Sequence, residues 1–160
     1  MARSLPVSDE GTTRQGPGDG PPYRLRVTES VPELDQRLSD ELDLVNAEAT
    51  RGTAPARELT VQIHDDEGEL AAGLSGWTWG LAAGIGMSWV REDNRGSGLG
   101  TRMLNGFEAE ARNRGCTHVF VTSFTFQAPG FYERHGYREI FRWDDVPVAG
   151  ASDVHFRKDL

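Results

Sequence analysis

The chain has 160 residues, of which 37% are hydrophobic and 26% charged, and its formal net charge at pH 7 is −8. This length suits one compact domain with a single hydrophobic core. The acidic balance argues against a nucleic-acid partner, because affinity for the phosphate backbone depends on clustered Lys and Arg. No stretch approaches the roughly 20 apolar residues that cross a bilayer, so we expect no membrane span.

Residues 1–22 contain four glycines and four prolines among polar residues. So few large apolar groups cannot offset the entropy of ordering, and we expect a mobile arm, with a partner-binding tail as the alternative. The start of the chain also lacks the apolar core of a secretory signal, and the only cysteine, Cys116, cannot form an intrachain disulfide. We therefore expect a cytoplasmic protein whose folded domain covers residues 23–160.

The first half of this domain predicts a strand, a helix and a hairpin. Residues 23–27 alternate in the manner of a half-buried strand. Pro32 then opens an amphipathic helix expected to pack on a sheet. Residues 59–63 and 69–74 read as two strands joined by a tight Asp/Gly turn. The helical spacing is carried by Leu34, Leu38, Leu42 and Val45.

The second half predicts a parallel crossover. Residues 84–90 read as a strand, residues 98–114 as a helix stopped by Gly115, and residues 117–122 as a β-branched strand. A strand, helix and strand at this spacing imply two parallel neighbours. A short helix at 129–135 and strands at 137–143 and 154–158 complete the expected elements.

The segment from Val90 to Gly100 carries the strongest chemical signal. It passes from a strand end through a glycine-rich turn into a helix, where free N–H groups and the positive helix terminus favour an anion such as a pyrophosphate. No Lys follows the glycines as in a P-loop, and the order G-x-G-x-G differs from the dinucleotide fingerprint G-x-G-x-x-G. A plain loop is the alternative.

Two motifs in order resemble the GNAT superfamily of acetyl-coenzyme-A-dependent acyltransferases. Residues 95–100, RGSGLG, match its signature R/Q-x-x-G-x-G/A, and residues 128–137, APGFYERHGY, are similar to its A-x-x-F-Y-E-K-x-G-F/Y segment. The resemblance covers roughly residues 23–160. It implies an α/β fold with a mixed, mostly antiparallel sheet of six or seven strands, helices on both faces, and one splayed parallel strand pair.

The resemblance also implies which residues bind acetyl-CoA. Backbone amides between Gly96 and Gly100 would hold the pyrophosphate, and Trp89 and Val90 would face pantetheine. At Thr125 the sequence departs from the Asn of many family members, so Gln127 is a second candidate for that contact. The complete expected set is Trp89, Val90, Arg95, Gly96, Ser97, Gly98, Leu99, Gly100, Thr101, Thr125, Gln127 and Phe131.

Tyr132 is the expected general acid, because the matching family tyrosine lies beside the coenzyme sulfur. A phenol donates to a departing thiolate only if its own pKa is lowered or the thiolate is desolvated. The alternative role for Tyr132 is that of a packed aromatic on the short helix.

The general base is not identified by the sequence. Residues 84–90 contain no carboxylate, although many family members carry a Glu there. Ser88 could hold a relaying water. The remote candidates are Glu92, Asp93, Asp144 and Asp145. The tryptophans 77, 79 and 143 could wall an acceptor pocket or pack in the core. The four histidines show no metal-ligand spacing, so we expect no metal.

Taken together, the residues and the resemblance predict an N-acetyltransferase that moves an acetyl group to a primary amine, expected to be that of a small molecule, by direct attack. Two alternatives remain. One is a protein lysine or N-terminal acetyltransferase, and the other is a non-catalytic acyl-CoA sensor. The resemblance also suggests a homodimer.

Overall fold

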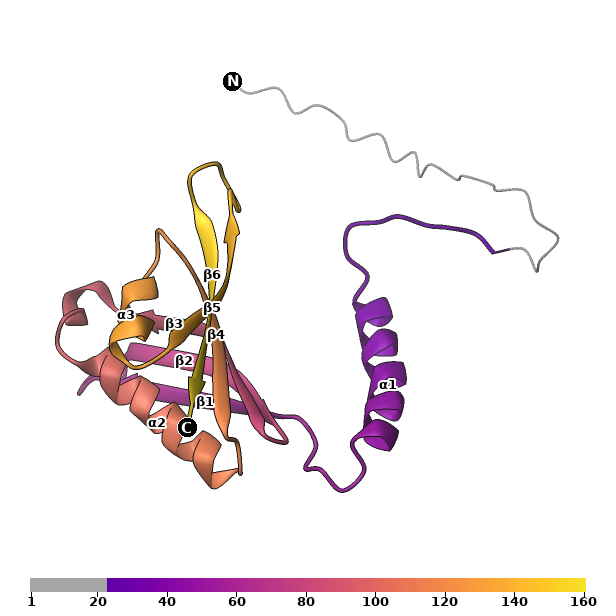
Figure 1. Cartoon of the computed structure of the whole chain (residues 1–160), viewed down its shortest axis with the longest axis horizontal. Coiled ribbons are helices and arrows are strands. Elements are labelled where there is room, and N and C mark those ends of the chain that lie inside the picture. Colours follow the sequence, from indigo (N-terminus) through magenta and orange to yellow (C-terminus); the bar gives the residue numbers. More distant parts are fainter. Residues whose placement is uncertain (1–22) are drawn as a thin grey trace. The chain divides into compact units, whose positions relative to one another are not determined.

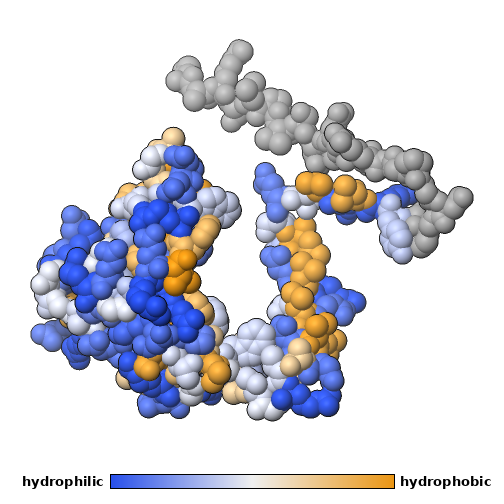
Figure 2. Space-filling model, viewed as in Figure 1, coloured by the Kyte–Doolittle hydropathy of each residue, from blue (hydrophilic) through white to orange (hydrophobic). Residues whose placement is uncertain are grey.

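The computed structural model describes residues 23–160, which fall into two units divided between Arg51 and Gly52 (Figure 1). The expected arm at residues 1–22 lies outside the described residues. The first unit contains α1, Pro32–Ala49, which begins with a proline in its first turn and carries Glu33 and Asp35 there. Its apolar residues gather along one side (Figure 2). The helix predicted from Pro32 is therefore confirmed.

The strand expected at residues 23–27 does not form, and this prediction is wrong. A strand needs a neighbour for its N–H and C=O groups. The described part of the first unit contains no other strand, so the alternation of apolar and polar residues has nothing to pair with.

The second unit is built on a six-stranded sheet with the order β1-β2-β3-β4-β6-β5. Only β3 and β4 pair in parallel, and every other neighbouring pair is antiparallel. The expected mixed, mostly antiparallel sheet with one parallel pair is confirmed. The strands are β1 Arg57–His64, β2 Leu70–Trp79, β3 Ala82–Val90, β4 His118–Phe124, β5 Arg138–Asp144 and β6 Ser152–Asp159.

Two helices pack on one face of this sheet. The helix α2, Leu99–Asn113, crosses over from β3 to β4, and α3, Pro129–Arg134, follows β4. The core lies between α2 and the sheet and includes Leu104, Phe107 and Val119, which are fully buried. A short 3-10 helix, η1, Glu92–Asn94, joins β3 to the turn that precedes α2.

The core also encloses an ion pair between α2 and β6. Glu108 is only 3% exposed, and its two carboxylate oxygens lie 2.8 and 2.7 Å from Lys158 Nζ. Lys158 also lies 5.5 Å from the ring centroid of Tyr137. Burial, and then the charge of Glu108, raise the pKa of Tyr137 above its usual range, so this phenol stays neutral.

We expect Lys158→Met to lower the free energy of unfolding by about 3 kcal/mol, because it leaves the buried Glu108 carboxylate with only the more distant Arg112, 3.6 Å away. The double variant Glu108→Leu/Lys158→Met should recover most of this loss, since it removes both charges. Urea unfolding measures both changes. Arg157→Met is the control, because its ion pair with Asp159 lies at the surface. Equal losses in the single and double variants would contradict this account.

Candidate active site

The site begins where β3 leaves β4. Their parallel pairing ends at Ile85 and Val121, and β3 carries a bulge at Gly86, because Gly76 pairs with Ile85 while Ser75 pairs with Met87. A bulge inserts one residue and bends its strand. Beyond this point β3 continues along β2 alone, so β3 and β4 splay apart as the sequence resemblance implied.

The bulge also reverses which side chains face the helices. Paired residues share a face of the sheet, and Leu74, which is buried in the core, pairs with Ser88. Ser88 and Val90 therefore point toward the helical face. Trp89, which pairs with Gly73, points toward the opposite face. Without the bulge, simple alternation from Ile85 would direct Trp89 to the helical face, and Ser88 and Val90 to the opposite face.

The backbone of the splayed part of β3 is open on one side. Arg91 donates its N–H to Ala71 of β2 at 2.9 Å, so the alternate residues Val90 and Ser88 direct their N–H and C=O groups away from β2. Arg95 Nε approaches the Val90 carbonyl oxygen from that side at 3.3 Å. An extended ligand can form strand-like hydrogen bonds along this edge.

The turn before α2 presents unpaired amides. Gly96 and Gly98 have φ values of 80° and 88°, which favour glycine, and a Cβ added at either would meet nothing within 4 Å. Within the described chain, Leu99, Gly100 and Thr101 donate their N–H groups to no carbonyl. Gly100 has a different role, because its Cβ would lie 3.2 Å from Phe131 Cε2 and would separate α2 from α3.

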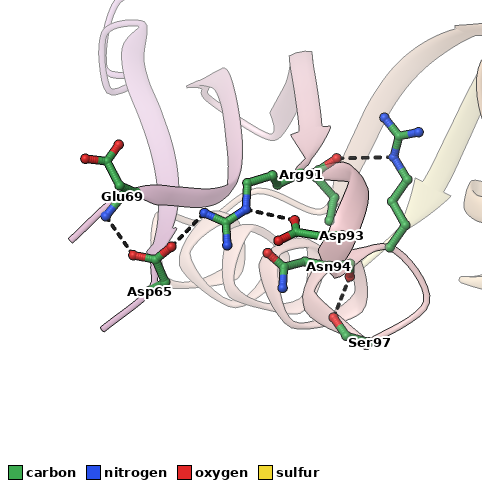
Figure 3. Close-up of polar contacts among 8 residues, drawn as sticks. Asp65, Glu69, Arg91, Asp93, Asn94 and Ser97 are labelled. Carbon is green, nitrogen blue, oxygen red and sulfur yellow. Dashed lines mark hydrogen bonds and ion pairs between the residues drawn. The ribbon is translucent and has the colours of Figure 1, made fainter. Parts of the chain in front are cut away.

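An ion-pair network anchors this turn to the β1-β2 hairpin (Figure 3). Arg91 NH1 lies 2.6 Å from Asp65 Oδ2, and Arg91 Nε lies 2.8 Å from Asp93 Oδ1. Asp65 also accepts the backbone N–H of Glu69 at 2.8 Å. Hydrogen bonding from Arg91, and then from the Glu69 amide, lowers the pKa of Asp65, so its carboxylate is charged throughout the neutral range.

Tyr132 lies on α3 with its hydroxyl directed across the cleft to β3. Its oxygen lies 2.8 Å from Ser88 Oγ, and the residue is 5% exposed. Burial raises the pKa of Tyr132, and the hydrogen bond with Ser88 offsets only part of this rise. The phenol therefore keeps its proton at neutral pH. The rings of Phe131 and Tyr137 pack edge-on against it and fix its position.

His135 joins α3 to the first turn of α2. Its Nδ1 lies 2.7 Å from the Phe131 carbonyl oxygen, and its Nε2 lies 2.9 Å from Thr101 Oγ1. Since a carbonyl can only accept, Nδ1 carries a proton, and in the neutral ring Nε2 accepts from the Thr101 hydroxyl. Sequence reasoning missed this contact, and the helical position of His135 facing the glycine turn was the available signal.

These parts line one cleft of about 850 Å³ between β3, β4, α2 and α3. It brings together most of the residues expected from the sequence, together with Ser88, Arg134 and His135. The expected residues that line it are Trp89, Val90, Arg95, Gly96, Gly98, Gly100, Thr101, Gln127, Phe131 and Tyr132.

Three expected contacts lie beside this cleft rather than on its wall. Ser97 Oγ donates to the Asn94 carbonyl, and Leu99 packs against the core. Thr125 ties the end of β4 to β6, because its N–H donates to Ser152 O at 2.9 Å and its Oγ1 accepts the Ser152 N–H at 3.0 Å. Gln127 lines the cleft, and its Oε1 accepts the Phe124 N–H, which leaves its amide nitrogen to donate.

The remote candidates for the base mostly have structural partners. Asp93 pairs with Arg91. Asp144 accepts from Ser152 Oγ at 2.8 Å, and Asp145 accepts the Gly150 N–H at 2.8 Å. Glu92 lies in η1 and is exposed. Between residues 23 and 160, no helix is long and apolar enough to span a membrane.

Comparison with known proteins assigns the class. Residues 24–137 match the model of the acetyltransferase (GNAT) family. The chain is 43% identical over 133 residues to a blasticidin-S acetyltransferase of Streptomyces morookaense, which covers 78% of this chain and 95% of that protein. It is 31% identical over 108 residues to an acetyltransferase of Agrobacterium fabrum, with 68% and 78% covered.

A solved structure of an acetyltransferase from Bacillus cereus superposes with a TM-score of 0.74 at 29% identity, covering 84% of this chain and 96% of that one. The chain belongs to the GNAT acetyltransferase family. It is an acetyl-CoA-dependent N-acetyltransferase, as the sequence predicted.

We expect Asp65→Asn to weaken the binding of coenzyme A roughly threefold to tenfold, because Arg91 loses its contact with the hairpin and the turn gains freedom. Isothermal titration calorimetry measures the change. Asp66→Asn is the control, because Asp66 lies in the same hairpin turn and its side chain makes no hydrogen bond to the described residues. Because the pKa of Asp65 is lowered, its ion pair with Arg91 is fully present above the ordinary carboxyl pKa of about 4. The ion pair is lost only as the pH falls through the lowered pKa of Asp65. Equal affinity of the Asp65 and Asp66 variants would contradict the anchoring role.

Proposed function

We propose that this N-acetyltransferase modifies the amine of a small molecule of antibiotic type, with blasticidin S as the first candidate. The observation that carries this proposal is the 43% identity that extends over 95% of a blasticidin-S acetyltransferase. Similarity over almost the whole relative includes the parts that surround an acceptor as well as the turn that binds the donor.

We further propose that the cleft between α2, α3 and the splayed strands holds acetyl-CoA, which supplies a thioester as the acetyl donor. The free amides at Leu99, Gly100 and Thr101 suit the pyrophosphate, since a helix N-terminus binds anions. Arg95 and Arg134 add positive charge in an otherwise acidic chain. The open backbone edge of Ser88 and Val90 suits the amide groups of pantetheine.

Tyr132 serves as the general acid in this proposal. Burial keeps its proton in place, and Ser88 holds its hydroxyl at a fixed point on the wall of the cleft. A neutral phenol at this point can donate a proton to the sulfur as the carbon–sulfur bond breaks. The same burial desolvates the departing thiolate and so raises its affinity for a proton. The acceptor nitrogen forms the new bond to the acetyl carbon by direct attack.

The substrate is tested by following release of the coenzyme thiol with blasticidin S as acceptor. We expect turnover by the parent and none by Gly98→Glu, whose carboxylate repels the pyrophosphate. Gly98→Ala is the matched control, because it carries the same strain at φ 88° without the charge and has space for its Cβ. It should keep measurable binding.

Two results would refute the proposed acceptor. Acetylation of a lysine peptide but of no small amine would make this a protein acetyltransferase. Binding of acetyl-CoA without thiol release from any acceptor would make it a sensor.

For Tyr132→Phe we expect kcat to fall about 10²- to 10⁴-fold, the usual contribution of a general acid, while the affinity for coenzyme A changes less than twofold. The ring and its packing remain, and only the hydroxyl and its bond to Ser88 are lost. Steady-state kinetics and calorimetry separate the two effects. An unchanged kcat would show that Tyr132 is a packed aromatic only.

A further inference from the structure

The reaction proposed above lacks a base, and the further inference rests on that proposed function. An alkylammonium group with a pKa near 10.4 must lose a proton before attack, which costs about 4.6 kcal/mol at pH 7. Strand β3 carries no carboxylate, and three of the remote candidates are held by other groups. Glu92, the fourth, is exposed in η1. A base on another element near the splay is therefore favoured.

We propose that His155, with the Asp153 carboxylate beside it, is the general base for the acceptor amine. Both residues lie on β6, two positions apart, and therefore on the same face of the sheet. His155 Nε2 lies 3.3 Å from Asp153 Oδ2. The side chains are 34% and 19% exposed, so the pair is partly shielded from water and still reachable from it.

Two atoms of this pair are unsatisfied in an unusual way. Within residues 23–160, Asp153 Oδ1 and His155 Nε2 are buried and neither makes a regular hydrogen bond. Buried polar atoms of folded proteins nearly always have partners, so an exception calls for an explanation. A reacting pair whose polar atoms are left for a substrate supplies one.

The strand register places His155 beside the opening in the sheet. His155 pairs with Thr122 of β4, and Thr122 directly follows Val121, the last residue of β4 that pairs with β3. Neighbouring strands lie about 4.8 Å apart, so His155 is one strand away from the splay. Its face is the one opposite the helices, because its neighbours on β6, Val154 and Phe156, are buried in the core.

This face suits an acceptor that approaches from the side opposite the donor. Trp89 points to it across the splay, and Phe141 and Trp143 of β5 pair with His155 and Asp153. Phe141 packs edge-on against the His155 ring with centroids 5.4 Å apart and limits its rotation. Aromatic side chains around Asp153 and His155 favour a cationic amine through cation–π attraction.

The carboxylate beside the ring supports its protonation during turnover. Asp153 Oδ2 lies 3.3 Å from Nε2 without a regular hydrogen bond, and no group among the described residues bonds to Nδ1, which is left as the proton acceptor. Asp153 then stabilises the imidazolium that forms, the role of the carboxylate in a triad. On this face β4, β5 and β6 also carry His118, Arg138, Arg157 and Asp159. Both arginines pair with Asp159.

The proton balance follows from these positions. His155 Nδ1 takes one proton from the ammonium and passes it to solvent. The nitrogen then bonds to the acetyl carbon as the carbon–sulfur bond breaks, and Nδ1 takes the second nitrogen proton. Tyr132 protonates the sulfur and is reprotonated through solvent by the imidazolium. One proton is released for each acetyl group transferred.

The test compares His155→Asn with the parent, using two acceptors across pH 6 to 9. With blasticidin S, the amine acceptor proposed above, we expect kcat/KM at pH 7 to fall about 10²-fold or more, and the defect to shrink as the pH rises. With hydroxylamine, whose nitrogen is neutral at pH 7, the same variant should keep activity within a fewfold of the parent. Calorimetry should find the affinity for coenzyme A unchanged.

Two further variants sharpen the test. Asp153→Asn should lower the rate with blasticidin S in the same acceptor-dependent manner, because the charge that stabilises the imidazolium is lost. His118→Asn, at the opposite end of β4, is the matched control and should behave as the parent.

Equal losses with both acceptors at every pH would mean a structural role and would overturn the proposal. Loss of less than threefold with blasticidin S would overturn it as well. If the parent binds acetyl-CoA but acetylates neither acceptor, the proposed function is wrong, and the assignment of His155 as its base is wrong with it.

Discussion

The site depends on one constraint, the end of parallel pairing between β3 and β4 at Ile85 and Val121. Parallel strands form evenly spaced hydrogen bonds, and one inserted residue stops that ladder. At Gly86 the insertion has three effects at once. It opens the sheet, it turns Ser88 toward Tyr132, and it leaves the N–H and C=O groups of Ser88 and Val90 without a neighbouring strand. The cleft proposed for the donor, the position of the proposed acid and the proposed acceptor approach all follow from that one residue.

Local charge matters more at this site than the net charge of −8. The turn carries Arg95 and the positive terminus of α2, with Arg134 on α3 opposite. Arg91 adds charge to the region, but two carboxylates engage it. It therefore serves to hold the turn in place, while the amides remain free to bind an anion. An acidic protein can thus present a cationic cleft.

Much of the fold was predictable from the sequence, because helix and strand periods, glycine turns and two ordered motifs all pointed to the same arrangement. The strand expected at residues 23–27 does not form. Alternation of apolar and polar residues indicates only a tendency toward a strand, which also needs a neighbouring strand to pair with. The direction of Ser88 was also beyond prediction. A bulge leaves no mark in the sequence other than a glycine, and Gly84–Gly86 contains two.

The pair Asp153 and His155 on β6 shows that the sequence alone is also limited in predicting candidate catalytic residues. Asp153 and His155 are spaced for one face of a strand, but the importance of that face depends on Thr122, which is 33 positions earlier than His155 and meets it only through the register. A sheet separates its two faces completely except where strands part. Because Tyr132 lies on the helical face and His155 on the other, an acid and a base can act on one reacting centre only through the splay. In this proposal, the opening that admits the donor therefore also couples the two proton transfers.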